Sequence, residues 1–178
     1  MAEGKSGDVQ FYAPRTRGVI PLDERFYVRK SLRQIIRAAK FDVTFDRNFE
    51  RVIRECARHT SHNDEEIWLS NEMIPIYIEL HNRGIAHSVE VWLSESLVGG
   101  LYGLHLGAAF FGESMFSTVP YASQVALVYL VEHLRERSFR LLDAQMPSEH
   151  LAQFGLYEIG HKEFMPQLEK ALGAVAKF

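Results

Sequence analysis

The first half of the chain repeats its apolar residues at helical spacing. Between residues 29 and 40, the apolar positions Leu32, Ile35, Ile36 and Ala39 share one face, which predicts an amphipathic helix. After a short strand, FDVTF, the positions Phe49, Val52, Ile53, Cys56 and Ala57 predict a second helix. Asp46 is of a residue type that favours the N-cap of that helix. A third helix is predicted over residues 71–82, with Gly84 as its stop.

After residue 86 the apolar period changes to two. The segments HSVEVWLS, LVGGLYGLHLG and AAFFGESMF predict three successive antiparallel strands. An amphipathic helix, SQVALVYLVEHLRER, leads into a short buried strand, RLLDAQ, which we expect to return parallel to the sheet. SEHLAQFG and HKEFMPQLEKALGA predict closing helices, whereas glycines and prolines mark residues 1–20 as irregular. The order predicts an α+β fold, a GNAT-type acetyltransferase-like mixed sheet flanked by helices, with one βαβ crossover.

Composition and charge restrict the class of protein. The chain has 178 residues, is 47% hydrophobic and contains one cysteine, Cys56, so an internal disulfide framework is excluded. The start, MAEGKSGDVQ, lacks the apolar core of a signal peptide, and no apolar run is long enough to span a bilayer. We therefore expect a cytoplasmic protein without a membrane partner.

Positive charge is concentrated in the N-terminal third. Residues 1–60 carry 13 Lys and Arg against 8 Asp and Glu, whereas the remainder carries 7 against 15. The basic residues form two helical stripes, a first stripe of Arg29, Arg33, Arg37 and Lys40 and a second of Arg47, Arg51, Arg54 and Arg58. Such stripes are either solvated helix faces or phosphate-binding surfaces that read no base sequence.

Two features of the sheet carry candidate chemistry. The stretch from Leu97 to Ser117 contains five glycines and one acid, Glu113, which is costly to bury without a partner. Asp143 and Gln145 alternate in LLDAQ, so we expect both side chains on one face of a strand, for catalysis or to satisfy backbone donors. No metal-ligand cluster and no dinucleotide fingerprint is present.

The segment expected to grip acetyl-CoA departs from what that cofactor requires. Its pyrophosphate usually lies against a glycine-rich turn at a helix N-terminus, where bare N–H groups face the anion. Here the segment is STVPYASQVAL, which has no glycine and contains a proline that removes a donor. We therefore expect an acyltransferase-like sheet that uses another activated acyl donor, with no cofactor and no metal.

Several motifs together resemble the leucyl/phenylalanyl-tRNA–protein transferases. The matching segments, in order, are RGVIPLD, EIWLSNEM, HSVEVW, LVGGLYG, FFGESMFS, ALVYLVEHLR and LLDAQ, and they cover the chain from about Phe11 onwards. The resemblance implies transfer of Leu or Phe, and less well Met, from aminoacyl-tRNA. The implied acceptor is the N-terminal α-amine of proteins that begin with Arg or Lys, which are thereby marked for degradation.

The resemblance also implies roles for particular residues. Asp143 and Gln145 are the implied catalytic pair, in which Asp143 polarises Gln145 and the Gln145 carbonyl oxygen draws a proton from the attacking amine. A proton route through the terminal ribose hydroxyl is the alternative. The implied substrate-binding residues are Glu113, Trp68, Phe110, Met115, Ser117, Leu101, Leu130, Leu134, Gly99 and Gly100. The implied tRNA contacts are Arg29, Arg33, Arg37, Lys40, Arg47, Arg51 and Arg54.

The N-terminus departs from the family pattern. The chain opens with MAEGKSGD, as though it starts inside a motif of the form FPMAE, so we expect most of the family's small N-terminal domain to be missing. Residues 1–20 are then a remnant or linker, and residues 21–178 form the aminoacyltransferase domain. Two other functions stay open, a CoA-dependent N-acetyltransferase and an inactive tRNA-binding remnant.

Overall fold

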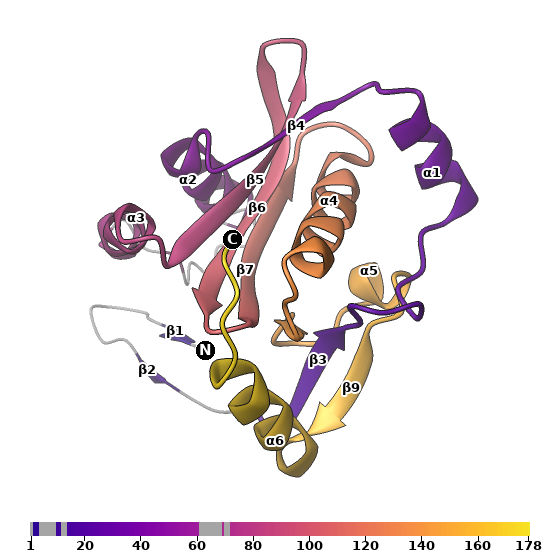
Figure 1. The fold of residues 1–178 in the computed structure, drawn as a ribbon. Coiled ribbons are helices and arrows are strands. Elements are labelled where there is room, and N and C mark those ends of the chain that lie inside the picture. Colours follow the sequence, from indigo (N-terminus) through magenta and orange to yellow (C-terminus); the bar gives the residue numbers. More distant parts are fainter. Residues whose placement is uncertain (1, 4–9, 12–13, 61–68, 70–71) are drawn as a thin grey trace.

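A single mixed sheet organises the molecule (Figure 1). The computed structural model describes residues 2–3, 10–11, 14–60, 69 and 72–178. Seven strands form the sheet, in the spatial order β4-β5-β6-β7-β8-β3-β9. Their bounds are β3 Thr16–Ile20, β4 Asp42–Phe45, β5 Ala86–Leu93, β6 Ser96–Leu106, β7 Ala109–Ser117, β8 Leu141–Asp143 and β9 Tyr157–Gly160. A separate pair joins β1 Ala2–Glu3 to β2 Gln10–Phe11.

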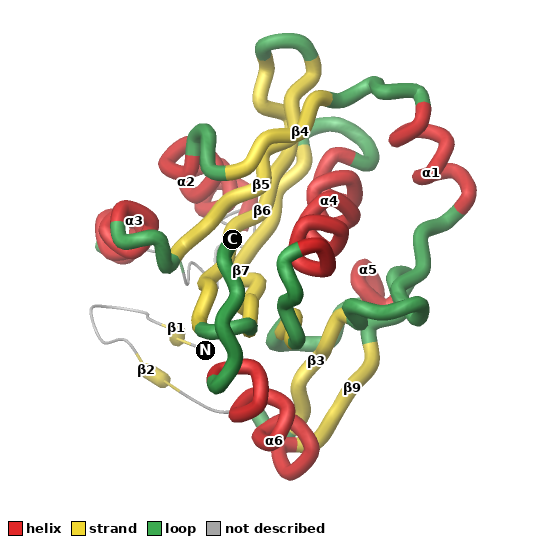
Figure 2. The backbone as a smooth tube through the Cα atoms, viewed as in Figure 1, coloured by secondary structure: helices red, strands yellow, loops and turns green. Residues whose placement is uncertain are grey.

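Six helices lie around the sheet within the described part of the chain (Figure 2). Their bounds are α1 Lys30–Arg37, α2 Phe49–Thr60, α3 Met73–Asn82, α4 Ala122–Glu136, α5 Glu149–Ala152 and α6 His161–Leu172. All six helical segments expected from the N-terminal half, the crossover and the C-terminus are therefore present, with α5 only four residues long. No described helix is long and apolar enough to cross a membrane.

The predicted meander and crossover are confirmed. β5, β6 and β7 pair antiparallel in sequence order, and α4 then returns the chain to β8, which pairs parallel to β7. The expectation of irregular structure through residues 1–20 is wrong for Thr16–Ile20, because β3 is a strand lying between β8 and β9. β9 was likewise not predicted. Both strands are short, and their hydrogen-bond partners are distant in sequence.

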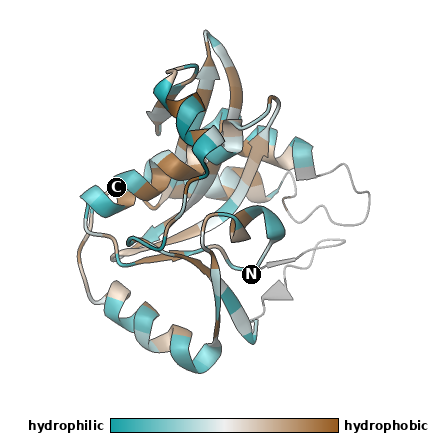
Figure 3. Ribbon diagram, turned by 90° about the vertical axis from the view of Figure 1, so that its right-hand side faces the viewer, coloured by the Kyte–Doolittle hydropathy of each residue, from teal (hydrophilic) through white to brown (hydrophobic). Residues whose placement is uncertain are grey.

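Helices α1 to α4 bury two apolar layers, one on each face of the sheet, and a third buried cluster includes Phe164 and Ala171 of α6. One layer contains Leu32 of α1, most of α4 and the inward residues Val89 and Val91 of β5. The other contains the buried face of α2 (Phe49, Val52, Ile53 and Cys56) together with α3. Figure 3 shows hydrophobic residues along the central strands and hydrophilic residues over much of α6 at the bottom of the molecule.

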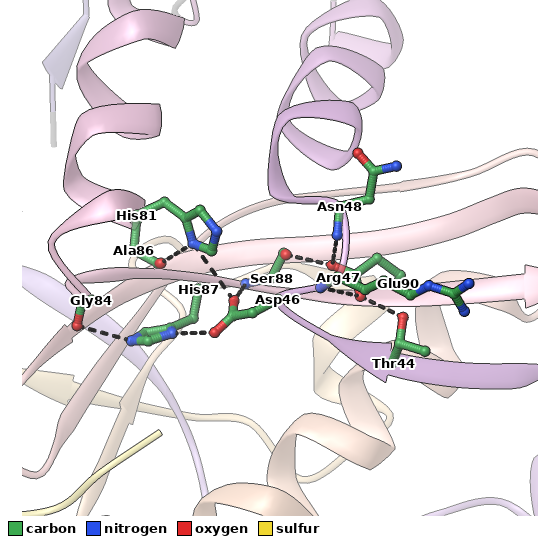
Figure 4. Close-up of polar contacts among 10 residues, drawn as sticks. All are labelled: Thr44, Asp46, Arg47, Asn48, His81, Gly84, Ala86, His87, Ser88 and Glu90. Carbon is green, nitrogen blue, oxygen red and sulfur yellow. Dashed lines mark hydrogen bonds and ion pairs between the residues drawn. The ribbon is translucent and has the colours of Figure 1, made fainter.

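The prediction that Asp46 caps α2 is wrong, and the cap comes from another element. Asp46 has a positive φ of 55° and turns back to the sheet, where it accepts from Ser88 N at 2.8 Å and pairs with His87 Nδ1 at 2.7 Å. The buried Glu90 carboxylate instead accepts from the backbone N–H groups of Arg47 and Asn48, both at 3.3 Å, immediately before α2 (Figure 4). A negative group at this helix end is favourable because unpaired N–H groups point towards it.

Candidate active site

A pocket opens where β7 and β8 separate. The two parallel strands pair only from Ala109↔Leu141 to Phe111↔Asp143, and the residues that follow on both strands border the opening. The pocket has a volume of about 100 Å³. Its lining residues are Ile20, Leu101, Tyr102, Gly112, Glu113, Ser114, Met115, Leu127, Leu130, Leu142, Ala144 and Leu151. The walls are therefore largely aliphatic, with one carboxylate among them.

Asp143 and Gln145 lie next to this pocket without lining it, and they are not neighbours on one strand face. β8 ends at Asp143, and Gln145 has a φ of 62°, so the expectation of two alternating side chains in one strand is wrong. Asp143 Oδ1 accepts from the backbone N–H of Gln145 at 2.8 Å. The Gln145 side chain donates from Nε2 to Gly112 O at 3.1 Å. Asp143 thus contacts the backbone of Gln145, and the Gln145 amide bridges to β7.

Glu113 faces the pocket from β7 and belongs to a small polar group. Tyr77 of α3 donates its hydroxyl to Glu113 Oε2 at 3.3 Å. Burial raises the pKa of the Glu113 carboxyl, which the Asp143 charge also raises, whereas hydrogen bonds from Gln145 and Tyr77 lower it. Burial and the neighbouring Glu113 raise the pKa of Tyr77. Because burial disfavours the ionised form of Glu113, a positively charged group that entered the pocket would stabilise its carboxylate.

The glycines of β6 are required by packing within the protein. A Cβ at Gly99 would lie 2.5 Å from Ala122 Cβ, and one at Gly100 would lie 2.7 Å from Val89 O. Gly99 thus lets the first residue of α4 approach the sheet. Gly112 of β7 differs, because the nearest atom to its Cβ position would be 3.7 Å away and the residue lines the pocket.

The remaining predicted substrate residues divide between the pocket and the core. Leu101, Met115 and Leu130 line the pocket together with Glu113. Phe110 and Leu134 are fully buried in the apolar layer and do not line it. Ser117 is the last residue of β7, and its hydroxyl donates to Val119 O at 2.7 Å in the link to α4. Trp68 lies outside the described residues.

Six pocket residues from outside β7 escaped the sequence analysis, and two of them, Leu142 and Ala144, flank the predicted Asp143. Leu127 and Tyr102 carried a usable signal, since Leu127 precedes Leu130 by one helical turn and Tyr102 stands inside LVGGLYG. Ile20 and Leu151 carried none, because they come from segments expected to be irregular or merely closing. Proximity of these segments to β7 is a product of the tertiary fold.

The two basic stripes lie over opposite faces of the sheet. α1 packs beside α4, and α2 packs on the other face against β5, β6 and β7 (Figure 1). The first stripe is fully exposed, and no ion pair holds its members within the described residues. In the second stripe, Arg47 and Arg51 lie over the Trp92 ring, at 5.5 and 5.8 Å from its centroid. Arg54 pairs with Glu50 at 2.7 Å.

Comparisons with known proteins agree with this architecture. The family model described as leucyl/phenylalanyl-tRNA protein transferase matches residues 19–169. The leucyl/phenylalanyl-tRNA–protein transferase of Synechococcus sp. (strain JA-3-3Ab) is 44% identical over all of this chain and 90% of that protein. The protein of the same name from Paramagnetospirillum magneticum is 50% identical over 93% of this chain and 78% of its own length.

Solved structures share the fold at low sequence identity. FemX superposes with a TM-score of 0.60 at 12% identity, covering 89% of this chain and 62% of its own. L-PGS from Bacillus licheniformis gives 0.56 at 11% identity, covering 89% and 65%. An aminoglycoside acetyltransferase from an uncultured soil sample gives 0.50 at 9% identity, covering 76% and 89%. The chain thus spans less than two thirds of FemX and of L-PGS.

These likenesses confirm the predicted α+β, acetyltransferase-like fold. The family match covers most of the chain, and the pocket, Glu113, Asp143 and Gln145 all fall inside the matched region. The relatives carry the same name at 44–50% identity. The chain therefore belongs to the leucyl/phenylalanyl-tRNA–protein transferase family of aminoacyltransferases.

Proposed function

We propose that the protein transfers Leu or Phe, and Met less well, from aminoacyl-tRNA to the N-terminal α-amine of proteins that begin with Arg or Lys. Products of this kind would be marked for degradation in the cytoplasm. The observation that carries the proposal is the aliphatic pocket at the β7/β8 opening, with Glu113 on its wall and the Asp143–Gln145 segment at its edge. Family membership supports the same reaction class.

The pocket suits an unbranched or γ-branched apolar side chain. Leu101, Met115, Leu127 and Leu130 present methyl and methylene groups to the space between β7 and α4. An apolar pocket discriminates between side chains by shape, at about 1–3 kcal/mol per missing or clashing methylene. We therefore propose that Leu, Phe and Met enter this space and that β-branched side chains clash near the reacting carbonyl.

The chemistry requires positioning and one proton transfer. The aminoacyl ester is already activated, so attack by the acceptor amine forms the C–N bond, breaks the ester C–O bond and moves one amine proton to the leaving ribose oxygen. An α-amine with a pKa of about 7.7–8.0 is neutral in roughly a tenth to a fifth of molecules at pH 7. A strong general base is therefore unnecessary.

The hydrogen bonding of Gln145 supports a role in orienting the attacking amine. Because its Nε2 donates to Gly112 O, its Oε1 is left to accept, and no donor reaches Oε1 among the described residues. We propose that Oε1 accepts a hydrogen from the amine while Glu113 attracts the positively charged end of the acceptor. The proton then leaves through Gln145 or through the terminal ribose hydroxyl.

The N-terminus of α4 gives little support to CoA as the donor. Ser123 N–H points to Ser117 Oγ at 3.4 Å, Ala122 N–H points to Val119 O at 3.4 Å, and Tyr121 before them has a φ of 76°. Two of the groups that would bind a pyrophosphate thus face acceptors of the chain itself. We propose that phosphates instead meet the exposed basic stripes, so that tRNA binding depends strongly on salt.

Transfer of radiolabelled Leu from Leu-tRNA tests the proposal. The acceptors are two peptides that differ only in their first residue, Arg or Ala, and the enzyme is compared with Asp143→Ala and with Leu130→Trp, which fills the pocket. The proposal predicts that the parent chain labels the Arg peptide, that Asp143→Ala abolishes this labelling, and that Leu130→Trp no longer uses Leu-tRNA as a donor. tRNA binding without any transfer would indicate a binding-only remnant, and labelling from acetyl-CoA would indicate an acetyltransferase.

A further inference from the structure

Arg17 of β3 faces the buried carboxylate at the active-site opening. Its Nη2 lies 3.4 Å from Asp143 Oδ2, and the Asp143 side chain is completely buried while that of Arg17 is 17% exposed. Asp143 Oδ2 accepts no hydrogen bond within the described residues. The guanidinium also lies over the Phe164 ring of α6, 5.0 Å from its centroid, which restricts its orientation.

A buried carboxylate of this kind needs a compensating charge. Moving a carboxylate out of water strongly disfavours its ionised form unless a cation or hydrogen-bond donors stabilise it. Here Oδ1 has one donor, the backbone N–H of Gln145, and Oδ2 has the guanidinium. Burial raises the pKa of Asp143, and the charge of Arg17 and the hydrogen bond from Gln145 act in the opposite direction.

The same strand also holds the backbone around Gln145. Gly18 N donates to Gln145 O at 3.0 Å, and Ala144 N donates to Gly18 O at 2.9 Å. A Cβ at Gly18 would lie 3.1–3.3 Å from Leu156 and Pro147, so β3 and this segment are closely packed. β3 therefore holds the backbone of Ala144 and Gln145 through hydrogen bonds, and its Arg17 provides a positive charge beside Asp143.

We propose that Arg17 is a positioning residue of the transfer reaction, which keeps Asp143 ionised and in place so that Asp143 holds Gln145 in its left-handed conformation. The inference rests on the proposed function for its catalytic consequence. Gln145 has a φ of 62°, which is unfavourable for a non-glycine residue, and the Asp143 Oδ1 hydrogen bond compensates for that strain. Without it the Gln145 amide would lose its fixed place at Gly112 O.

The consequence is a specific change in pH dependence. Among the described residues, the charged or titratable groups facing Asp143 are Arg17 from β3 and Glu113 from β7. Removing the cation raises the pKa of Asp143 further, so a larger fraction is protonated at neutral pH and transfer slows. Raising the pH restores the carboxylate. The loss of transfer activity caused by replacing Arg17 with an uncharged residue should therefore become smaller as pH increases.

The proposal is tested by measuring kcat of Arg17→Met and Arg17→Lys from pH 6 to 8.5. Each kcat is divided by that of the parent at the same pH, which cancels the effect of ionisation of the acceptor amine. Nearby charges shift a carboxyl pKa by about 1–3 units, so we expect Arg17→Met to lose about tenfold or more in kcat at pH 6. The deficit in kcat of Arg17→Met relative to the parent should become smaller by pH 8.5, and KM for the tRNA should change little. Arg17→Lys should lose less, because it keeps the charge but not the planar group.

A matched control and a double variant separate positioning from folding. Arg15→Met removes the same charge two residues away at an exposed position, and we expect it to leave kcat within about twofold. Arg17→Met added to Asp143→Asn should have no further effect, because the two residues act as one unit. A loss that is equal at every pH, or fully additive with Asp143→Asn, would overturn the proposal.

A readout without turnover keeps the inference separate from the proposed function. ¹³C-carboxyl NMR titration of Asp143 in the parent and in Arg17→Met should show a higher midpoint in the variant. An unchanged midpoint refutes the role of Arg17 whatever the activity. If the parent transfers no amino acid but the midpoint does rise, the proposed function fails while the interaction between Arg17 and Asp143 stands.

Discussion

Replacing Glu90 by Gln tests how the sheet fixes the start of α2. Glu90 is completely buried, and its two oxygens meet four donors: Ser88 Oγ at 2.5 Å, Thr44 Oγ1 at 2.6 Å, and the N–H groups of Arg47 and Asn48 at 3.3 Å. Gln has nearly the same shape but turns one acceptor into a donor. The change therefore alters hydrogen bonding with little change in volume.

The geometry decides which bonds are lost. If the new NH₂ takes the place of Oε2, it faces Arg47 N–H and the Thr44 hydroxyl, which already accepts from Trp92 Nε1 at 2.8 Å. If it takes the place of Oε1, the Ser88 hydroxyl can reverse, but Asn48 N–H loses its acceptor. Either way one backbone N–H loses its partner, at about 1–3 kcal/mol, and α2 loses a negative charge near its N-terminus, at about 0.5 kcal/mol.

Urea and thermal unfolding measure the effect. We expect Glu90→Gln to lower the free energy of unfolding by about 2 kcal/mol, which corresponds to a fall in Tm of about 4–8 °C for a domain of this size. Glu50→Gln is the matched control, because Glu50 is exposed and its ion pair within the described residues is with Arg54, so its cost should stay below about 0.5 kcal/mol. Equal costs for the two variants, at unchanged m-value, would refute the assignment of Glu90 as the cap of α2.

Three further outcomes follow from the same structure. Gly99→Ala should cost about 1–3 kcal/mol because its Cβ meets α4 at 2.5 Å, whereas Gly173→Ala, in ordinary contact at 3.4 Å, should stay within about 0.5 kcal/mol in urea unfolding. Burial raises the pKa of Glu113, so the native state retains that proton to higher pH than the unfolded chain does, and stability falls as Glu113 ionises. Glu113→Gln should therefore gain stability relative to the parent between pH 4 and 7. Parallel curves of stability against pH for the two proteins would contradict this. Arg33→Gln should reduce the magnitude of the slope of log K for tRNA binding against log salt concentration by about 0.9. Arg83, by contrast, pairs with Glu79 of α3, and Arg83→Gln should leave this slope unchanged.

Local pattern predicted most of the secondary structure of the chain. The helical period gave α1 and α2, and the change to a period of two gave the β5–β6–β7 meander. These elements are specified by residues close together in sequence, because each must turn its apolar side towards the sheet. The motifs that carried the family resemblance predicted roles for Glu113, Asp143 and Gln145, and in the structure these three residues lie close together.

Other features depended on residues that are distant in sequence. Asp46 satisfies the local rule for an N-cap, yet Ser88 and His87 bind its carboxylate and Glu90 takes its place at α2. LLDAQ reads as one strand, yet β8 ends at Asp143 because Gln145 is held by Gly18 of β3 and Gly112 of β7. In both cases a long-range hydrogen bond outweighs the local preference.

The sequence by itself thus determined the helices, the β5–β6–β7 meander, β8, the order of these elements and the chemical groups available for transfer. The tertiary structure decided the separation of β7 from β8, the insertion of β3 beside β8 and the burial of Asp143 against Arg17. The physical reason is that helical and strand periods are local properties of the chain. Burial and charge at a point depend instead on which distant segments pack there, and here β3 brings Arg17 to a carboxylate 126 positions further along the chain.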